Sequence, residues 1–277
     1  MPLVLALLSS VVWGTSDFLA GRMSRNFPAI AVLGGSQIFG LCLALGFTFA
    51  TDNWDTSNRT VIIWGVTAGL LGLVGLMAFY SALATGLMGI VSPISSVGVI
   101  IPLAIGLARG DQPTKYQLLG ILLALVGVVL ASGPELSGKT TRKPVYLAFI
   151  AAVTFGTCVF CMAQGGQAGN PAMTIATMRI CQVASLVFAA IVLRSVGGLT
   201  AKNIPMLIAI GVTDASANIL FAFAATDGLL SIVSVLGSLF PVMTVILAWA
   251  ILKERLMNVQ YAGAVCTILG VVAITAG

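Results

Sequence analysis

Gly86-Leu87-Met88-Gly89-Ile90-Val91-Ser92 returns 142 positions later as Gly228-Leu229-Leu230-Ser231-Ile232-Val233-Ser234. Other parts of the chain repeat at about the same distance. The further matches are Ser96 with Ser238, Trp13-Gly14-Thr15 with Phe155-Gly156-Thr157 and, after one inserted residue, Gln117, Gly120 and Gly127 with Gln260, Gly263 and Gly270. An almost wholly apolar chain that is duplicated in this way is typical of a transporter built from two membrane-embedded halves.

The composition of the chain is that of an integral membrane protein. Of its 277 residues 59% are hydrophobic and only 8% are charged, with a mean hydropathy of +1.11, whereas a soluble domain has about 25% charged residues. So few charges cannot cover a water-facing surface, and the expected partner of the outer surface is the lipid bilayer. The net charge of +5 comes from Lys and Arg in short connections between apolar runs, which indicates orientation in a membrane and not nucleic-acid binding.

Ten apolar runs are long enough to cross a bilayer, which takes roughly 20 mainly apolar residues in a helix. The first half is predicted to span at 3–22, 29–50, 61–83, 87–108 and 114–132, and the second half at 145–165, 172–193, 204–226, 229–252 and 257–276. The predicted fold class is therefore an all-α membrane protein with ten transmembrane helices.

A hydrophilic segment near the middle of the chain divides these helices into two sets of five. The predicted organisation is a first repeat at 1–132, a linker at 133–144 and a second repeat at 145–277. Because five is an odd number, the second half enters the membrane from the opposite face, and the two repeats are inverted. Substrate sites in such folds lie near the membrane midplane, between the halves.

The distribution of basic residues gives one prediction of the orientation. The face that holds the termini carries Arg59, Arg109 and Lys115. The opposite face carries Arg22, Arg25, Lys139, Arg142, Lys143, Arg194, Lys202, Lys253 and Arg255. Because basic loops prefer the cytoplasmic side, this count places both termini outside.

Two ionisable residues are predicted to meet inside the membrane. An ionisable side chain in hydrocarbon needs a partner or a water-filled cavity. At about 1.5 Å rise per residue, Arg179 lies on the order of 10 Å from one face, and Asp214 lies near the midplane after entering from the other. They can form an ion pair that lines the substrate pathway, with Arg179 holding a substrate carboxylate. The alternatives are a purely structural pair, or an Arg179 that caps backbone carbonyl groups.

Asp17 is a third ionisable residue in an apolar run. It precedes Arg22 by five residues, so the two could form an ordinary ion pair near the membrane interface. Alternatively, a carboxylate inside the membrane is a candidate carrier for a coupling proton.

Aromatic and amide side chains in the apolar runs are candidates for the wall of a substrate cavity. Asn218 follows Asp214 by four residues, on the same helix face. The other predicted wall residues are Trp13, Gln37, Phe79, Tyr80, Phe155 and Gln164. Plain packing or lipid contact is the alternative for each of them.

The residues that are missing limit the possible chemistry. With no histidine and five cysteines scattered in apolar runs, we expect no metal, no cofactor and no enzyme activity. An aspartyl protease would need Asp17 and Asp214 side by side, but their predicted depths differ by about 8 Å. No nucleotide-binding domain fits in the chain, which favours a secondary carrier. A channel or an accessory subunit remains open.

Several motifs mark a family. They are the aromatic–Gly pairs Trp13-Gly14 and Phe155-Gly156, the loop prolines Pro28 and Pro171, Arg179 eight residues after Pro171, Pro241, and Leu252-Lys253-Glu254-Arg255-Leu256 followed by Gln260, Gly263 and Gly270-Val271. With them the chain resembles the ten-helix, EamA-type members of the drug/metabolite transporter superfamily over essentially its whole length. The first half departs from the pattern at Gln37 (where a counterpart of Arg179 is expected), at Pro102 and at Asp111, so a fully symmetric site is not expected.

The resemblance implies alternating-access transport of a small metabolite in the bacterial cytoplasmic (inner) membrane. An amino acid or a similar compound is the expected substrate, with export favoured. A cationic drug exporter and a carrier for sugar or metabolite uptake are the alternatives, and the protein is expected to act as a monomer or a homodimer. The resemblance also implies cytoplasmic termini, against the charge count, so the orientation stays open.

Overall fold

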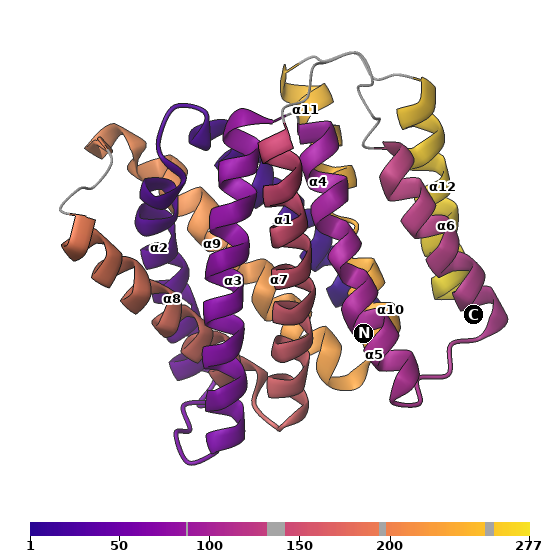
Figure 1. The fold of residues 1–277 in the computed structure, drawn as a ribbon. Helices are drawn as coiled ribbons and strands as arrows, with labels where there is room; N and C mark the ends of the chain where they lie inside the picture. Colours follow the sequence, from indigo (N-terminus) through magenta and orange to yellow (C-terminus); the bar gives the residue numbers. More distant parts are fainter. Residues whose placement is uncertain (87, 132–141, 194–197, 253–257) are drawn as a thin grey trace.

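The structure is a computed structural model that describes residues 1–86, 88–131, 142–193, 198–252 and 258–277, and all regular secondary structure in these ranges is helical (Figure 1). The helices are α1 (Pro2–Ser24), α2 (Ala29–Ala50), α3 (Arg59–Thr85), α4 (Met88–Ser96), η1 (Val97–Val99), α5 (Ile100–Ala108), α6 (Lys115–Ala131), α7 (Arg142–Gln167), α8 (Pro171–Leu193), η2 (Ala201–Asn203), α9 (Ile204–Asp227), α10 (Leu230–Gly237), α11 (Phe240–Leu252) and α12 (Asn258–Ala276).

These helices make ten membrane crossings, as the sequence predicts. Among the described residues nine helical segments are long and apolar enough to span a bilayer, with α4 and α5 forming one of them and α10 and α11 another. The tenth is α6, whose 17 residues are at the lower limit for a transmembrane helix. The all-α membrane fold is confirmed.

The fourth and ninth crossings are broken near their middle, which the sequence reading did not predict. A proline inside a helix removes the hydrogen bond to the carbonyl four residues earlier and clashes with that carbonyl. Pro102 acts on Gly98, inside η1, and Pro241 acts on Gly237, the last residue of α10. The breaks therefore lie where the two prolines place them.

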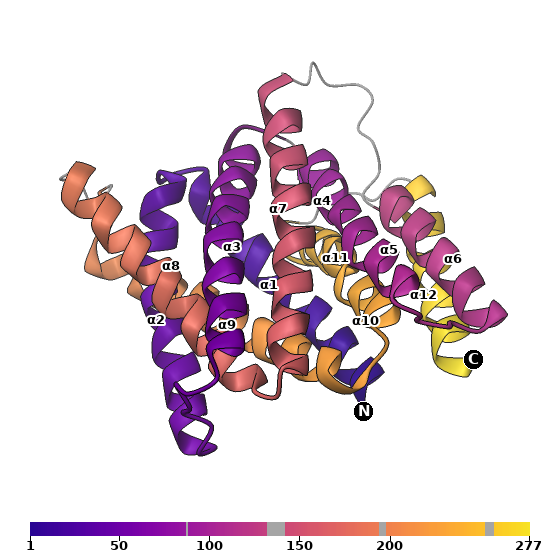
Figure 2. The same ribbon diagram turned by 60° about the horizontal axis from the view of Figure 1, so that its bottom comes forward.

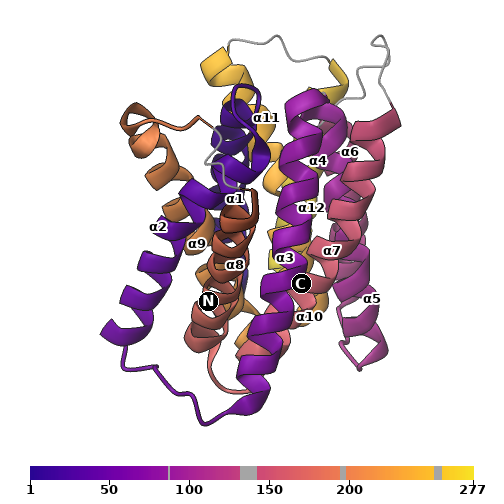
Figure 3. The ribbon, with the colours of Figure 1, turned by 60° about the vertical axis from the view of Figure 1, so that its left-hand side comes forward.

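The two halves run through the membrane in opposite directions. In Figures 1 and 2 both termini lie toward the lower end of the bundle, and the connection from α2 to α3 lies there too. Figure 3 shows the same connection at the bottom, opposite the ends at which α3 and α4 meet. The first half therefore begins at the lower end, and the second half, which begins with α7 at the upper end, is inverted.

Helices of the two halves interleave, and the separate five-helix bundles suggested by the repeat are not formed. The most extensive packing joins α6 to α12, α3 to α7, α1 to α9 and α2 to α9, always across the halves. The pair of α6 and α12 stands at one edge of the molecule in Figures 1 and 2.

Close glycine contacts confirm a pseudo-twofold axis that relates each residue to the one 142 positions later. A Cβ atom on Gly14 would lie 2.5 Å from the carbonyl oxygen of Phe240, and one on Gly156 would overlap the carbonyl of Gly98. Gly69 and Gly211 are related in the same way, because they pack on the carbonyls of Met178 and Ser36. Such contacts let membrane helices approach closely. The equivalent contacts confirm the duplication seen in the sequence.

The outer surface is apolar and the centre is polar, the reverse of a soluble protein. Phe188 and Ile191 are each 69% exposed, whereas Arg179 is fully buried together with Gln37. This distribution fits a protein whose solvent is lipid.

Two predicted features lie outside the described residues. These are most of the linker at 133–144, of which the structure describes only the part from Arg142 onward, as the beginning of α7, and the charged motif Lys253-Glu254-Arg255.

Candidate functional site

A cavity opens between the two halves, with about 790 Å³ of atom-free space including its mouth. It is lined by Trp13, Asp17, Gly72, Leu76, Ser95, Ser96, Gly98, Val99, Pro102, Phe155, Gly156, Cys158, Val159, Met162, Met178, Arg179, Gln182, Asp214, Asn218, Phe221, Ser234, Gly237, Ser238 and Phe240. The wall is mostly apolar, with polar groups from α1, α8, α9 and the two broken crossings.

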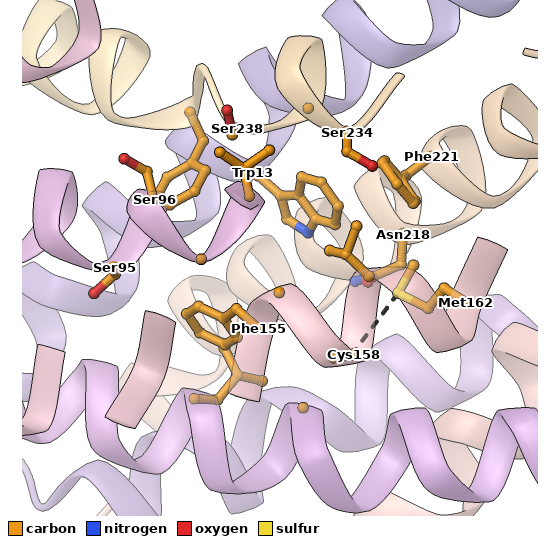
Figure 4. Close-up of a pocket in the computed structure, with 18 of the residues that line it drawn as sticks. Trp13, Ser95, Ser96, Phe155, Cys158, Met162, Asn218, Phe221, Ser234 and Ser238 are labelled. Atoms are coloured by element: carbon orange, nitrogen blue, oxygen red, sulfur yellow. Dashed lines mark hydrogen bonds between the residues drawn. The ribbon is translucent and has the colours of Figure 1, made fainter. Parts of the chain in front are cut away.

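The broken crossings bring matching serines to the cavity. Ser96 ends α4 and Ser238 follows α10, so each lies at a break, and they are equivalent in the repeat. Figure 4 shows both of them beside Trp13, whose indole ring projects into the cavity and packs on Phe221 with 5.5 Å between ring centroids. Broken helices at a midplane cavity are common in transporters, because polar backbone is tolerated there.

Arg179 of α8 is the centre of a buried polar cluster. Its Nη1 donates hydrogen bonds to Oδ2 of Asp214 at 2.8 Å, to Oε1 of Gln182 at 3.3 Å and to Oε1 of Gln37. The contact with Asp214 is the only ion pair among the residues that the structure describes. The sequence-based expectation that these two residues approach each other agrees with this geometry.

The carboxylate of Asp214 is held by several members of this cluster. Besides Arg179, it accepts hydrogen bonds from Nε2 of Gln37 at 3.1 Å and from Nδ2 of Asn218 at 3.2 Å. Because its charge is paired, Asp214 is not the free carboxylate that an aspartyl protease or a cation exporter would need at this position.

One edge of the Arg179 guanidinium group has no acceptor in the described part of the chain. Both Nε and Nη2 are buried and make no hydrogen bond, although Arg179 borders the cavity. This pair of N–H groups forms the planar fork that matches a carboxylate in bidentate geometry. An unpaired buried donor is costly, so such groups in native structures need a partner.

Asp17 of α1 borders the same cavity and is not paired with Arg22. It is 9% exposed, whereas Arg22 is on the exposed surface, and no ion pair joins them in the described ranges. Its carboxylate accepts no hydrogen bond from any residue with a described position, and it is repelled by the negative charge of Asp214. The interfacial ion pair was therefore the wrong alternative.

The predicted wall residues divide into two groups. Trp13, Phe155 and Asn218 lie on the cavity wall with Asp17, Arg179 and Asp214. Gln37 and Tyr80 do not line the cavity, and both are fully buried. Gln37 instead supports the charge pair.

Two further predicted wall residues also lie elsewhere. Phe79 packs behind the wall on Phe155 and Phe240, and Gln164 binds Arg109 at an exposed end of α7. The depth of a residue along its helix therefore did not predict whether its side chain faces the cavity.

The sequence reading missed several polar wall residues. Gln182 lies three residues after Arg179, on the same helix face, and this spacing could have identified it. Ser96 and Ser238 were visible as a polar pair conserved between the two repeats.

Comparisons with known proteins agree with this architecture. Residues 1–133 and 142–276 each match the EamA-like transporter family. An uncharacterized protein of Methanocaldococcus jannaschii is 28% identical over 131 residues, which are 47% of this chain and 95% of that protein. A solved crystal structure is similar in fold, with a TM-score of 0.78 and 13% identity over 99% of this chain and 96% of the other. The chain is therefore a multi-pass membrane transporter that belongs to the EamA-like transporter family of the drug/metabolite transporter superfamily.

Proposed function

We propose that this transporter is a secondary-active carrier for a small metabolite that bears a carboxylate, with an amino acid as the best fit. The observation that carries the proposal is the unpaired Nε and Nη2 edge of Arg179 beside the central cavity. A carboxylate would accept both N–H groups at once and satisfy two buried donors.

The remaining wall favours a ligand whose other end is apolar. Trp13, Phe155, Phe221 and Phe240 supply aromatic surface, and Leu76 with Val99 and Met162 supplies aliphatic surface. A sugar has no carboxylate that would accept both N–H groups of the unpaired Arg179 edge at once. A carboxylate with an apolar side chain fits this site better.

The proposed cycle is alternating access in a bacterial cytoplasmic membrane, with export as the favoured direction. Support comes from the inverted repeats, here taken as residues 1–132 and 145–277, and from the two broken crossings at the cavity, because such helices line the moving sites of many carriers. Coupling to a proton is part of the proposal.

A cationic drug exporter is the second candidate, and one observation favours it. Asp17 borders the cavity without a positively charged partner among the described residues. In that case a large apolar amine without any carboxylate would be transported.

The proposal is tested by flux in proteoliposomes that contain the purified full chain. We expect radiolabelled leucine to move down an imposed gradient in wild-type vesicles. The substitution Arg179→Lys keeps the charge but loses the planar fork, and loss of one charge-assisted hydrogen bond of about 1.5 kcal/mol or more lowers affinity roughly tenfold.

Arg59→Lys is the matched control, because Arg59 is exposed at the beginning of α3. Leucine flux that is equal in wild-type, Arg179→Lys and Arg59→Lys vesicles would refute the carboxylate role of Arg179. Transport of apolar amines but of no carboxylate would favour the second candidate.

A further inference from the structure

The charges around the cavity do not balance. Arg179 contributes one positive charge, and Asp17 and Asp214 contribute two negative ones. The ion pair joins Arg179 to Asp214 at 2.8 Å, so Asp17, when it is ionised, has no oppositely charged partner among the described residues.

The environment of Asp17 makes this charge unfavourable. The carboxylate is about nine-tenths buried, and the other ionisable side chains on the cavity wall are Asp214, Arg179 and Cys158. Asp214 repels it, and no ion pair within the described ranges joins it to Arg179. A buried charge without a partner costs several kcal/mol, so Asp17 is suited to a positively charged ligand.

Asp17 lies beside an aromatic residue of the cavity wall that also favours a cation. Trp13 precedes it by one helical turn on α1 and faces the same cavity. Trp13 also packs on Phe221, and aromatic faces attract ammonium groups. Val159 is the residue that the twofold repeat places opposite Asp17, so the acid is present on one wall only.

We propose that Asp17 binds the positively charged amino group of the substrate while Arg179 holds its carboxylate. This inference rests on the proposed function, and it deepens it. The ligand then carries both charges, and one carboxylate and one ammonium group replace the missing partners of Arg179 and Asp17 together. Neither a simple carboxylic acid nor a simple amine satisfies both residues.

Three ligands with the same apolar side chain test the inference. Leucine has both charged groups, 4-methylpentanoate lacks the amino group, and 3-methylbutylamine lacks the carboxylate. We would measure their affinities by calorimetry on the full chain in detergent, for wild type and for Asp17→Asn. The expected result is that wild type binds leucine most tightly, and that Asp17→Asn weakens leucine at least tenfold while 4-methylpentanoate is unchanged.

Two further variants keep the test informative. Asp17→Glu retains the charge and should keep part of the preference for leucine, even if Asp17→Asn folds poorly. Asp52→Asn removes an exposed carboxylate outside the helices. Asn tolerates the positive φ of 54° at this position, so this control should bind all three ligands as wild type does.

Each other outcome overturns the inference. Equal weakening of leucine and 4-methylpentanoate would make Asp17 a structural residue, and unchanged leucine binding would leave it a proton carrier or a bystander. If wild type binds 4-methylpentanoate as tightly as leucine, the ammonium site is refuted while the carboxylate proposal stands. If only the amine binds, or none of the three, both proposals are refuted.

Discussion

Removing the charge of Arg179 should destabilise the protein more than removing the charge of Asp214. The two residues form a buried ion pair at 2.8 Å, with Arg179 fully buried and Asp214 5% exposed. Removing one partner of a buried pair costs about 3–5 kcal/mol, because the other charge is left uncompensated. Asp17 decides where within that range each variant falls.

The charges that remain differ between the two substitutions. Arg179→Gln leaves Asp17 and Asp214, which already repel each other, and no positive charge. Asp214→Asn leaves Arg179 and Asp17 at the same cavity, so the remaining charges are opposite. We therefore expect Arg179→Gln to lose about 5 kcal/mol of unfolding free energy, at the upper end of this range, and Asp214→Asn about 3 kcal/mol, at its lower end.

The double variant Arg179→Gln/Asp214→Asn removes both charges and keeps groups that form hydrogen bonds. Replacing a whole buried pair by neutral groups is often close to neutral, so the double variant should be more stable than Arg179→Gln alone. Unfolding free energies would be measured by reversible denaturation in mixed micelles. Equal losses for the two single variants, or losses that simply add in the double variant, would contradict this account.

Two other predictions concern packing and helix ends. Gly211→Ala would drive a Cβ atom into the carbonyl of Ser36, and we expect it to lower the free energy of unfolding by about 1–3 kcal/mol. The control is Gly34→Ala, because a Cβ atom there meets nothing within 4 Å, and it should change the free energy of unfolding by less than about 1 kcal/mol. Equal losses for the two variants would contradict the close contact at Gly211. Asp111 accepts a hydrogen bond from the backbone N–H of Ser231 at 2.8 Å, so Asp111→Ala should cost about 0.5–2 kcal/mol by uncapping α10. Unchanged thermal stability in detergent would exclude this capping role.

The sequence predicted the crossings well because hydropathy measures what the bilayer selects. The second predicted span, 29–50, coincides with α2 (Ala29–Ala50). The broken fourth and ninth crossings were missed because the apolar run continues across each break, although Pro102 and Pro241 mark the positions. Hydropathy does not detect a lost backbone hydrogen bond.

The sequence predicted how deep the site residues lie in the membrane, but not the directions in which their side chains point. Rise per residue brought Arg179 and Asp214 to a common level, and the structure joins them. Rotation about the helix axis and the choice of neighbours are set by packing across the halves, as in α3 with α7 and α1 with α9. For this reason the sequence left open whether Asp17 pairs with Arg22 at the interface or serves the pathway, and the structure places Asp17 on the cavity wall.

The departures of the first half from the second follow from the position of the twofold axis. Arg179 and Gln37 are equivalent in the repeat, and they contact each other directly. The substitution Gln37→Arg would therefore place two guanidinium groups side by side with Asp214 as their only paired anion. Two like charges 4 Å apart repel by about 4 kcal/mol at an effective dielectric constant of 20.

The two halves also differ in the size of the side chains that they place at equivalent central positions. Gly72 is the counterpart of Asp214, and a Cβ atom on it would lie 2.9 Å from Nε2 of Gln182. Gly40 is the counterpart of Gln182, and its Cβ would lie 3.7 Å from Nη1 of Arg179. The first half thus supplies room where the second supplies polar side chains. Residues that lie on the twofold axis contact their own counterparts from the other half. The centre of a duplicated backbone therefore has room for only one charge pair of the Arg179–Asp214 kind. The asymmetry of the sequence at these positions follows from that arrangement.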